Sequence, residues 1–293
     1  MKYLLSLMMS AVFSTFSIIN AQNFDEVSIE TTKLSEHVYM LVGAGGNIGV
    51  SIGEDGVFII DDEFAPLTPK IEAAIRKLSD KPLQYLANTH FHGDHTGGNE
   101  NMHNLGTTII AHDNVRKRLQ LPQQDGTTSP ISALPVITFN DQLNMYINSE
   151  HIAIFHVDNA HTDGDSMLYF TESNVLHTGD VYFNGRYPYI DLDSGGSVNG
   201  YIEGVKKGLM LIGEDTKIIP GHGGLSNKGE YETFLTMLES LKTAVLVEIN
   251  TGKTEDEVAN NKDLTKAYDA LNYGDGFINS ETIRRTFYKS LKE

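Results

Sequence analysis

The chain has 293 residues, 40% of them hydrophobic, which is enough for one sizeable domain or at most two small ones, and we expect one. Its formal net charge of −17, with no basic run, argues against a nucleic-acid partner, because phosphate binding depends on patches of Lys and Arg. The lack of cysteine excludes disulfides and thiolate metal ligands.

The first 21 residues have the pattern of a signal peptide. Lys2 precedes an apolar stretch from Tyr3 to Ile19, and cleavage is expected after Ala21. An uncleaved membrane anchor is the weaker alternative, because the stretch is short and interrupted by Ser and Thr. No cysteine follows it to carry a lipid. We therefore expect residues 22–293 to form one soluble domain, periplasmic or secreted, with no stable membrane insertion.

The N-terminal half alternates apolar runs with turns that contain glycine. Three runs predict a β-meander: Val38–Val42, Ile48–Ile52 and Val57–Ile60. The turn Gly43–Asn47 lacks the last glycine of a GxGxxG phosphate loop and no helix follows it, so we interpret it as a flexible hairpin. Apolar spacing predicts a helix over Pro69–Leu78. The next elements alternate between strand and helix and predict an α/β layer: Leu83–Ala87, Gly98–Leu105, Thr107–Ala111 and Asp113–Leu119.

The C-terminal half follows a predicted loop, Leu121–Pro135, with three prolines and no periodic pattern. Short apolar runs then predict a second sheet: Ile137–Phe139, Asn144–Ile147, Ile152–His156, Met167–Phe170 and Val175–His177. Two helices are predicted with a short strand between them: Asn199–Leu211, Thr216–Ile219 and Tyr231–Ile249. Residues 254–292 are expected to be mostly helical, with Phe277 and Phe287 packed inside.

Three imidazoles and one carboxylate fall within six residues after the strand that ends at Ala87. They belong to His90, His92, Asp94 and His95. Burying such groups together costs free energy unless a metal or hydrogen-bond partners compensate them, so a metal site is favoured over a polar loop that caps a helix. A tight turn would direct the first two histidines at one ion and the other two residues at its neighbour. Imidazole and carboxylate ligands favour zinc first, with iron and manganese as alternatives.

At these residues the sequence resembles the metallo-β-lactamase superfamily, whose HxHxDH signature follows a strand. The resemblance covers essentially the whole mature chain, because the later ligands have counterparts in order: His161 in Ala160-His161-Thr162, Asp180 in Thr178-Gly179-Asp180 and His222 in Pro220-Gly221-His222-Gly223. It implies a four-layer αβ/βα sandwich with a metal site at one edge, between two sheets. It also implies Asp180 as a bridge between two ions, one held by His90, His92 and His161 and the other by Asp94, His95 and His222.

Such a site implies hydrolysis. Two divalent ions about 3.5 to 4 Å apart hold a bridging hydroxide, because each lowers the pKa of bound water toward about 7. One ion would polarise a substrate carbonyl and the other would stabilise the leaving group, while Asp94 orients the water. No serine or cysteine nucleophile is needed, and the sequence has no GxSxG motif.

The residue at position 180 bears on the substrate. The β-lactamases of the superfamily that use two zincs usually have Cys or Ser there, whereas a bridging Asp resembles its glyoxalase II thioesterases, lactonases and phosphodiesterases. Export disfavours cytosolic glutathione thioesters and the acidic charge disfavours a nuclease. We therefore expect a small cyclic amide or ester, a β-lactam or a lactone, with thioester or phosphodiester hydrolysis as the alternative. A di-iron redox module is disfavoured because those relatives show HxExD, and this chain has His92 at the Glu position.

Residues that follow Asp180 are candidates for substrate contacts. Arg186 is the nearest cation, and it either binds a substrate carboxylate or covers the surface. The aromatic residues around it either line an apolar pocket or pack their own loop: Tyr182, Phe183, Tyr187 and Tyr189.

Other polar residues near the ligands are expected to have supporting roles. Asp61 and Asp62 would hydrogen-bond to ligands or cap a helix. His112 is expected to be structural, although it ends a strand on the same side as the signature. Asp163 and Asp165 compete with Asp180 as carboxylate ligands. Five further histidines have no ligand-like context: His37, His103, His151, His156 and His177.

Overall fold

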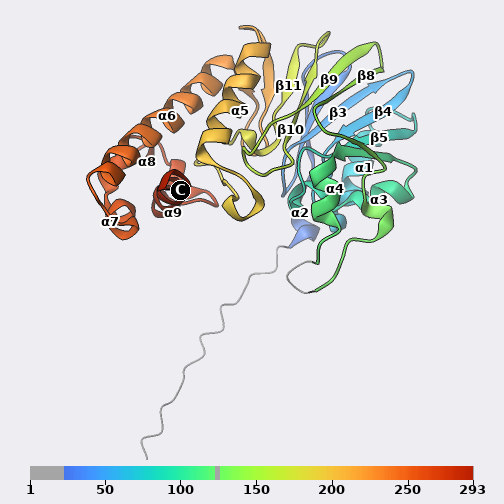
Figure 1. Cartoon of the computed structure of the whole chain (residues 1–293). Helices are drawn as coiled ribbons and strands as arrows, with labels where there is room; N and C mark the ends of the chain where they lie inside the picture. The colour runs from blue at the N-terminus through green and yellow to red at the C-terminus, as the bar shows by residue number, and fades with distance from the viewer. Residues whose placement is uncertain (1–22, 123–125, 293) are drawn as a thin grey trace, which may run out of the picture.

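Two β-sheets pack face to face, and each carries helices on its outer face (Figure 1). The computed structural model describes residues 23–122 and 126–292, so the predicted signal peptide lies outside the described residues. No helix within these two ranges is long and apolar enough to cross a membrane. The order of layers is helix, sheet, sheet, helix, which confirms the predicted αβ/βα sandwich.

The first sheet has seven strands in sequence order: β1 (Glu30–Lys33), β2 (Val38–Val42), β3 (Ile48–Gly53), β4 (Gly56–Ile60), β5 (Leu83–Ala87), β6 (Thr108–His112) and β7 (Ile137–Phe139). The first four form an antiparallel meander, of which β2 to β4 were predicted, whereas β4 to β7 pair in parallel. Parallel neighbours need crossover connections, and these contain helices: α1 (Thr68–Arg76), α2 (Gly93–Thr96), α3 (Asn99–Asn104) and α4 (Asp113–Leu119). The carboxyl ends of β4, β5 and β6 therefore meet at one edge.

The second sheet has six strands in the order β13-β12-β11-β10-β9-β8. Their bounds are β8 (Gln142–Ile147), β9 (Glu150–His156), β10 (Ser166–Phe170), β11 (Val175–His177), β12 (Lys217–Ile219) and β13 (Ser226–Asn227). The helix α5 (Val198–Leu211) lies in the crossover between β11 and β12, which pair in parallel. The long helix α6 (Lys228–Asn250) follows β13.

Period-two alternation distributes the apolar side chains between separate cores. In β4, Phe58 and Ile60 join the core between the two sheets, whereas Val57 and Ile59 pack toward α1. Because β4 is buried on both faces, every one of its positions is buried and its sequence is continuously apolar. A third core joins the second sheet to α5, α6 and α9 (Ser280–Lys292). Each large apolar side chain buried in this way contributes about 1.5 to 3 kcal/mol.

The C-terminal region contains short helices before α9, namely α7 (Glu255–Asn260) and α8 (Lys266–Asp269). Phe287 is fully buried, as predicted. The prediction for Phe277 was wrong, because its side chain is 82% exposed in the bend between α8 and α9. The strand β1 was not predicted either, since its four residues are all exposed and show no apolar alternation.

Candidate metal centre

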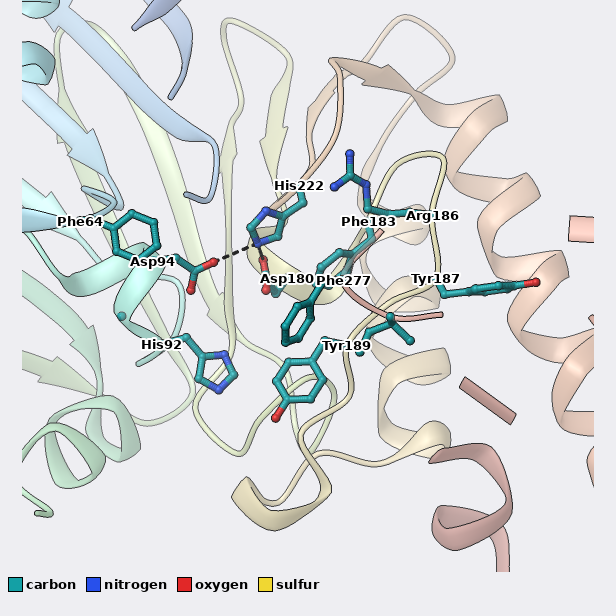
Figure 2. Close-up of a pocket in the computed structure, with 12 residues that line it drawn as sticks. Phe64, His92, Asp94, Asp180, Phe183, Arg186, Tyr187, Tyr189, His222 and Phe277 are labelled. Carbon is teal, nitrogen blue, oxygen red and sulfur yellow. Dashed lines mark ion pairs between the residues drawn. The ribbon is translucent and has the colours of Figure 1, made fainter. Parts of the chain in front are cut away.

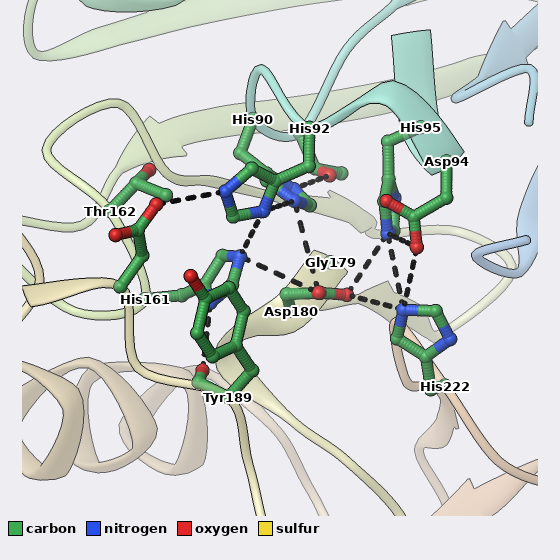
Figure 3. A network of polar contacts seen from close by, with 12 residues as sticks. His90, His92, Asp94, His95, His161, Thr162, Gly179, Asp180, Tyr189 and His222 are labelled. Carbon is green, nitrogen blue, oxygen red and sulfur yellow. Dashed lines mark hydrogen bonds and ion pairs between the residues drawn. The ribbon is translucent and has the colours of Figure 1, made fainter. Parts of the chain in front are cut away.

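Loops from both sheets converge at one edge of the sandwich, beside a cavity (Figure 2). The loop after β5 carries His90, His92, Asp94 and His95, and the loops after β9, β11 and β12 carry His161, Asp180 and His222. These seven residues form two groups, within each of which the candidate ligand atoms lie within 4.8 Å of one another. Figure 3 shows the two groups on either side of Asp180.

A short helix inside the signature separates its ligands. His90 and His92 lie on the segment before α2, whereas Asp94 and His95 lie on α2 itself, which begins at Gly93. The backbone of His92 is extended, with φ −63° and ψ 148°, so the chain changes direction directly after it. One helical turn thus places the two pairs of ligands in different groups.

The first group is built from three imidazoles. His92 Nδ1 lies 3.1 Å from His90 Nε2 and 2.8 Å from His161 Nε2, so three ring nitrogens converge. The outer nitrogens face acceptors, since His161 Nδ1 is 2.8 Å from the Tyr189 carbonyl oxygen and His92 Nε2 is 3.1 Å from Asp191 Oδ2. A ring that donates on its outer nitrogen keeps a lone pair on the inner one. We therefore infer that the inner ring nitrogens direct their lone pairs toward one another. A cation between them would stabilise this arrangement.

The second group combines two imidazoles with a carboxylate. His222 Nε2 lies 3.3 Å from Asp94 Oδ2 and 3.4 Å from His95 Nε2. His95 Nδ1 donates to Asp61 Oδ2 at 2.8 Å, which leaves His95 Nε2 to face the group. The side chains of Asp94 and His222 are 30% and 20% exposed, so this group opens toward the cavity.

Asp180 lies between the groups and turns one oxygen to each. Its Oδ2 is 3.5 Å from His161 Nε2 and 3.8 Å from His90 Nε2. Its Oδ1 is 3.1 Å from His95 Nε2 and 3.4 Å from His222 Nε2. Oδ1 is buried and accepts no hydrogen bond of good geometry. A buried carboxylate oxygen without a partner is costly unless a cation neutralises it.

Two glycines allow the backbone to approach Asp180. A Cβ atom at Gly221 would lie 2.1 Å from Asp180 Oδ1. Gly179 has a φ of 51°, and a Cβ atom there would lie 2.6 Å from the Thr89 side chain. A larger residue at either position would therefore displace a part of the site. This explains why glycine precedes both Asp180 and His222.

Burial and neighbouring charges set the protonation of the two groups. Burial lowers the pKa of His90 well below its usual value and that of His161 to about 4, so both rings are neutral at neutral pH. Burial also lowers the pKa of His222, but Asp180 and Asp94 outweigh it and raise this pKa to about 9. Burial raises the pKa of Asp94, but the neighbouring histidines outweigh it and lower this pKa to about 2.

The donor atoms fit divalent cations. His90 and His161 offer neutral imidazoles to the first position, and the ionised carboxylate of Asp94 accompanies imidazoles at the second. Nitrogen and oxygen donors without sulfur suit zinc, iron and manganese. A cation at the second position would displace the proton of His222, because ligands bind metals in their deprotonated forms.

The same arrangement belongs to a known family. The family model described as the metallo-beta-lactamase superfamily matches residues 42–247. The chain belongs to the metallo-beta-lactamase superfamily. A relative within the superfamily, the hydroxyacylglutathione hydrolase of Pelagibacter ubique, is 30% identical over 203 residues, which are 67% of this chain and 70% of that protein. The chain is thus a metallo-hydrolase, as the sequence predicted.

Solved structures share the fold of this chain. A metallo-beta-lactamase from Pontibacter korlensis has a TM-score of 0.62 at 15% identity, and the match covers 72% of this chain and 99% of that chain. The inverting sec-alkylsulfatase Pisa1 from a Pseudomonas species has a TM-score of 0.67 at 16% identity, covering 89% of this chain and 50% of that chain. At these identities the likeness concerns the fold alone.

Asp61 supports ligands of both groups in this superfamily member. Besides accepting from His95, it accepts hydrogen bonds from Thr89 N at 2.8 Å and Thr89 Oγ1 at 2.7 Å. Thr89 Oγ1 in turn lies 3.1 Å from His90 Nδ1. Asp62 Oδ1 accepts from Gly98 N at 2.9 Å. Both residues thus act through hydrogen bonds rather than as ligands, as expected.

A cavity of about 500 Å³ adjoins the metal centre (Figure 2). Four candidate ligands reach it, namely His92, Asp94, Asp180 and His222. Its other large side chains are mostly aromatic or apolar: Phe64, Phe183, Arg186, Tyr187, Tyr189, Phe277 and Ile278. Arg186 is the one Arg or Lys among the described residues that line it, and we find no ion pair or hydrogen bond between it and another described residue.

The two tyrosines singled out as substrate contacts have different places. Tyr187 is among the residues that line the cavity, but it is 1% exposed and its hydroxyl donates to Asp269 Oδ1 at 2.7 Å. Tyr182 is 1% exposed, packs against Tyr231 and Phe234, and does not line the cavity. The structure therefore places Tyr182 in the core, and we do not retain it as a substrate contact.

The glycine-rich turn Gly43–Asn47 is packed against the metal centre, so its interpretation as a flexible hairpin was wrong. Two backbone N–H groups of the turn donate to Glu63 Oε2 at 2.9 and 3.1 Å, and the Asn47 amide donates to the Pro220 carbonyl oxygen at 2.8 Å. A Cβ atom at Gly46 would lie 2.1 Å from the His95 ring. Glycine here permits close packing.

The remaining histidines and acidic candidates stay outside the two ligand groups. His112 caps α4 and stacks on His156, with ring centroids 3.8 Å apart. Asp163 pairs with Arg118 at 2.6 Å. Asp165 accepts a hydrogen bond from His161 N at 2.7 Å and so supports a ligand without being one. Of the three carboxylates considered after β9, Asp180 alone joins the described ligand groups.

Several functional residues were missed from the sequence. Asp191 faces the outer nitrogen of His92 across 99 positions of sequence, and no local pattern marks it. Glu63 and Phe64 come directly after Asp61 and Asp62. Three consecutive acidic residues at the end of a buried strand are unusual, and that density was a usable signal for a site at this edge.

Proposed function

We propose that the chain is an exported hydrolase that binds two zinc ions and opens a small cyclic amide or ester, such as a β-lactam or a lactone. The observation that carries the proposal is the pair of ligand groups beside one largely apolar cavity, with Asp180 facing both groups. A pair of divalent ions supplies an activated water molecule and polarises the acyl oxygen. The residues of the chain hold the ions, orient the water and bind the substrate.

The choice of two zinc ions follows from the donors. Each group reaches four donors when Asp180 is counted in both, and four nitrogen or oxygen donors suit zinc. The two Asp180 oxygens face different groups, which favours a bridging role over a single shared ion.

Asp94 is the residue that we assign to the water. It is a ligand candidate of the second group and also lines the cavity. Its pKa of about 2 keeps it ionised at neutral pH, so it can accept a hydrogen bond from the attacking water and orient it. This role agrees with its partial exposure, which the ligands of the first group lack except for His92.

Arg186 and the aromatic walls indicate the kind of substrate. Ligand pockets of small molecules have volumes of about 300 to 1,000 Å³ and bury most of the ligand. The cavity falls in this range at about 500 Å³. Arg186 is half-buried in its wall, and an Arg can bind a carboxylate through two parallel hydrogen bonds. We infer a small acyl compound with one carboxylate and a substantial apolar part.

Thioester hydrolysis is the second candidate. It is supported by the relative at 30% identity, whose name specifies a hydroxyacylglutathione as its substrate. A thioester presents the same acyl carbon to the same water, so the metal centre suits either reaction. Glutathione itself carries two carboxylates, whereas one Arg or Lys was found among the described lining residues. A smaller thioester therefore fits this cavity better.

The decisive experiment compares substrate classes on zinc-loaded protein of residues 22–293. A chromogenic cephalosporin, a simple lactone and a simple thioester are each tested with and without a chelator. Chelator-sensitive opening of the cephalosporin or lactone supports the first candidate, and turnover of the thioester alone supports the second. No chelator-sensitive turnover of any of the three contradicts both.

Two further measurements test the metal and the export. Elemental analysis of the purified protein is expected to give two zinc ions per chain and a colourless solution, whereas stoichiometric iron would favour redox chemistry. Expression of the full chain in a bacterium, followed by N-terminal sequencing of the periplasmic fraction, is expected to give Gln22 as the first residue. A cytosolic protein that retains Met1 would contradict export.

A further inference from the structure

Phe277 is an exposed aromatic residue inside the cavity wall. Its side chain is 82% exposed, although Phe is usually among the more buried residue types. It lines the cavity together with Ile278, and Figure 2 draws its ring among the other lining residues. Both residues lie beyond residue 247, where the superfamily match ends. This part of the wall is therefore specific to the C-terminal region of the chain.

The segment that carries Phe277 is held firmly on both sides. On one side, Tyr187 N donates to the Tyr273 carbonyl oxygen at 3.1 Å, and the rings of these two residues pack 5.7 Å apart. On the other side, Ser280 Oγ donates to Asp269 Oδ1 at 2.6 Å, and Ile278 is buried. An exposed ring on an anchored backbone can bind a ligand with little loss of conformational entropy.

An aromatic row connects Phe277 to the metal centre. Its ring meets Tyr189 edge to face, with centroids 5.7 Å apart and an interplanar angle of 85°. Tyr189 in turn stacks on His92 at 5.7 Å and 27°. A ligand group that lies along this row would contact Phe277 at one end while its reacting atom stays near the metal centre.

Arg186 occupies a different part of the wall. Phe183, three positions before it, stacks on His222 of the second group at 5.1 Å. Figure 2 shows Arg186 nearer to His222 and Tyr189 nearer to His92. Phe183 also meets His161 of the first group edge to face at 6.3 Å, so the charged and aromatic parts of the wall lie on different sides of the cavity in Figure 2 but are not each confined to one ligand group. A carboxylate bound by Arg186 leaves the aromatic row free for the apolar part of the substrate.

We propose that Phe277 is a specificity-determining residue that binds an aromatic or bulky apolar acyl group against Tyr189, so that aryl-acyl substrates are preferred to acetyl substrates. This preference rests on the hydrolysis proposed above and adds the class of acyl group that the cavity binds. Aromatic pairs of this kind contribute beyond the area that they bury, and with that burial the preference is expected to be about tenfold or more.

The test combines binding with turnover. Binding of phenylacetate and acetate to zinc-loaded protein is measured by titration calorimetry, and hydrolysis of phenylacetyl and acetyl esters with the same leaving group is followed in parallel. The wild type is expected to prefer the phenyl compounds about tenfold in Kd and KM, and Phe277→Ala is expected to reduce this preference to about twofold with kcat little changed. Phe277→Tyr should retain most of it.

A matched control uses Leu271→Ala, because Leu271 is 64% exposed in the same region and does not line the cavity. This variant should keep the wild-type preference, and both variants should keep the wild-type melting temperature. An equal preference in wild type and Phe277→Ala would overturn the inference while leaving the hydrolase proposal intact. A phenylacetate preference that depends on Phe277, without chelator-sensitive turnover of these esters or of the cephalosporin, lactone and thioester, would support the inference and contradict the hydrolase proposal.

Discussion

The two ligand groups of the centre differ in their burial and in the number of residues that face the outer atoms of their ligands. The first contains three imidazoles, two of which are fully buried, and Thr89, Asp191 and the Tyr189 carbonyl oxygen face their outer nitrogens. The second contains the carboxylate of Asp94, and both Asp94 and His222 are partly exposed to the cavity. Among the described residues, we find such an outer partner in the second group for His95 alone.

This difference indicates that the two metal positions have different roles. Hydrogen bonds from neighbouring residues orient metal ligands and raise affinity, so the first position is expected to hold its ion more firmly. The second position is accessible and carries Asp94, so it is expected to exchange its ion more readily and to be closer to the substrate. Changes to the ligands and to the residues around them should therefore affect activity and ion binding to different degrees.

The largest effect is expected from His92→Ala, which removes a ligand of the first group. Hydrolysis should fall by about a thousandfold or more, because metal stabilisation of the transition state is worth several kcal/mol. The side chain is 19% exposed, so the variant should still fold, with a melting temperature close to that of the wild type in the absence of metal. Steady-state kinetics with the best substrate would measure the loss. Undiminished activity would exclude His92 from the centre.

A fall in pH should empty the second position before the first. Against the effect of burial, nearby carboxylates raise the pKa of His222 to about 9 in the metal-free protein and also raise the pKa of His95, so protons compete with the second ion at both rings, and each further unit of pH weakens binding by about tenfold for each ligand that must lose its proton. His161 has a lowered pKa of about 4 and His90 is also shifted down, so protons compete less for these two ligands of the first position than for the histidines of the second. Zinc content after dialysis between pH 8 and pH 5 would show one ion lost before the other. Simultaneous loss would contradict the comparison.

Asp61 and Thr89 offer a way to weaken the groups to different extents. Asp61→Asn removes the carboxylate that accepts from His95 Nδ1 and should weaken the second ion by about ten- to a hundredfold, with a smaller effect on the first ion through Thr89. Thr89→Val removes the hydroxyl that faces His90 Nδ1 and should act mainly on the first ion. Zinc affinities of the two variants, measured by competition with a chromogenic chelator, would reveal the two patterns. Identical affinity profiles would show that Asp61 does not distinguish the groups.

The parts of this centre that could be predicted are those with a local signal. His90, His92, Asp94 and His95 stand within six residues after an apolar strand, and strands such as β4 and β5 show their burial in their own sequence. The later ligands are single residues in separate loops, and they were identified through their order in the superfamily resemblance. These later ligands meet the signature residues only because the two sheets pack face to face, which brings the loops of both sheets to one edge.

The parts that could not be predicted depend on contacts between distant segments. The glycines of the Gly43–Asn47 turn suggested freedom of motion, but Gly46 lacks a side chain because the His95 ring occupies that space. Phe277 was expected to be buried on hydrophobicity alone, yet its position in the cavity wall follows from how the C-terminal segment meets the loop around Tyr187. Neither arrangement leaves a periodic pattern in the sequence.

The smallest effect is expected from Arg186→Ala, which tests whether the side of the cavity near His222 binds the carboxylate of the substrate. Without the guanidinium, KM should rise by about tenfold for substrates with a carboxylate and stay within about twofold for their methyl esters, since a charge-assisted hydrogen bond of this kind is worth about 1.5 to 3 kcal/mol at most. Arg186→Lys restores the charge without the planar fork and should recover part of the difference. Michaelis–Menten kinetics on matched acid and ester pairs would measure it. Equal increases for both members of a pair would assign Arg186 to the structure of its loop, and carboxylate recognition would then have to come from the metal centre itself.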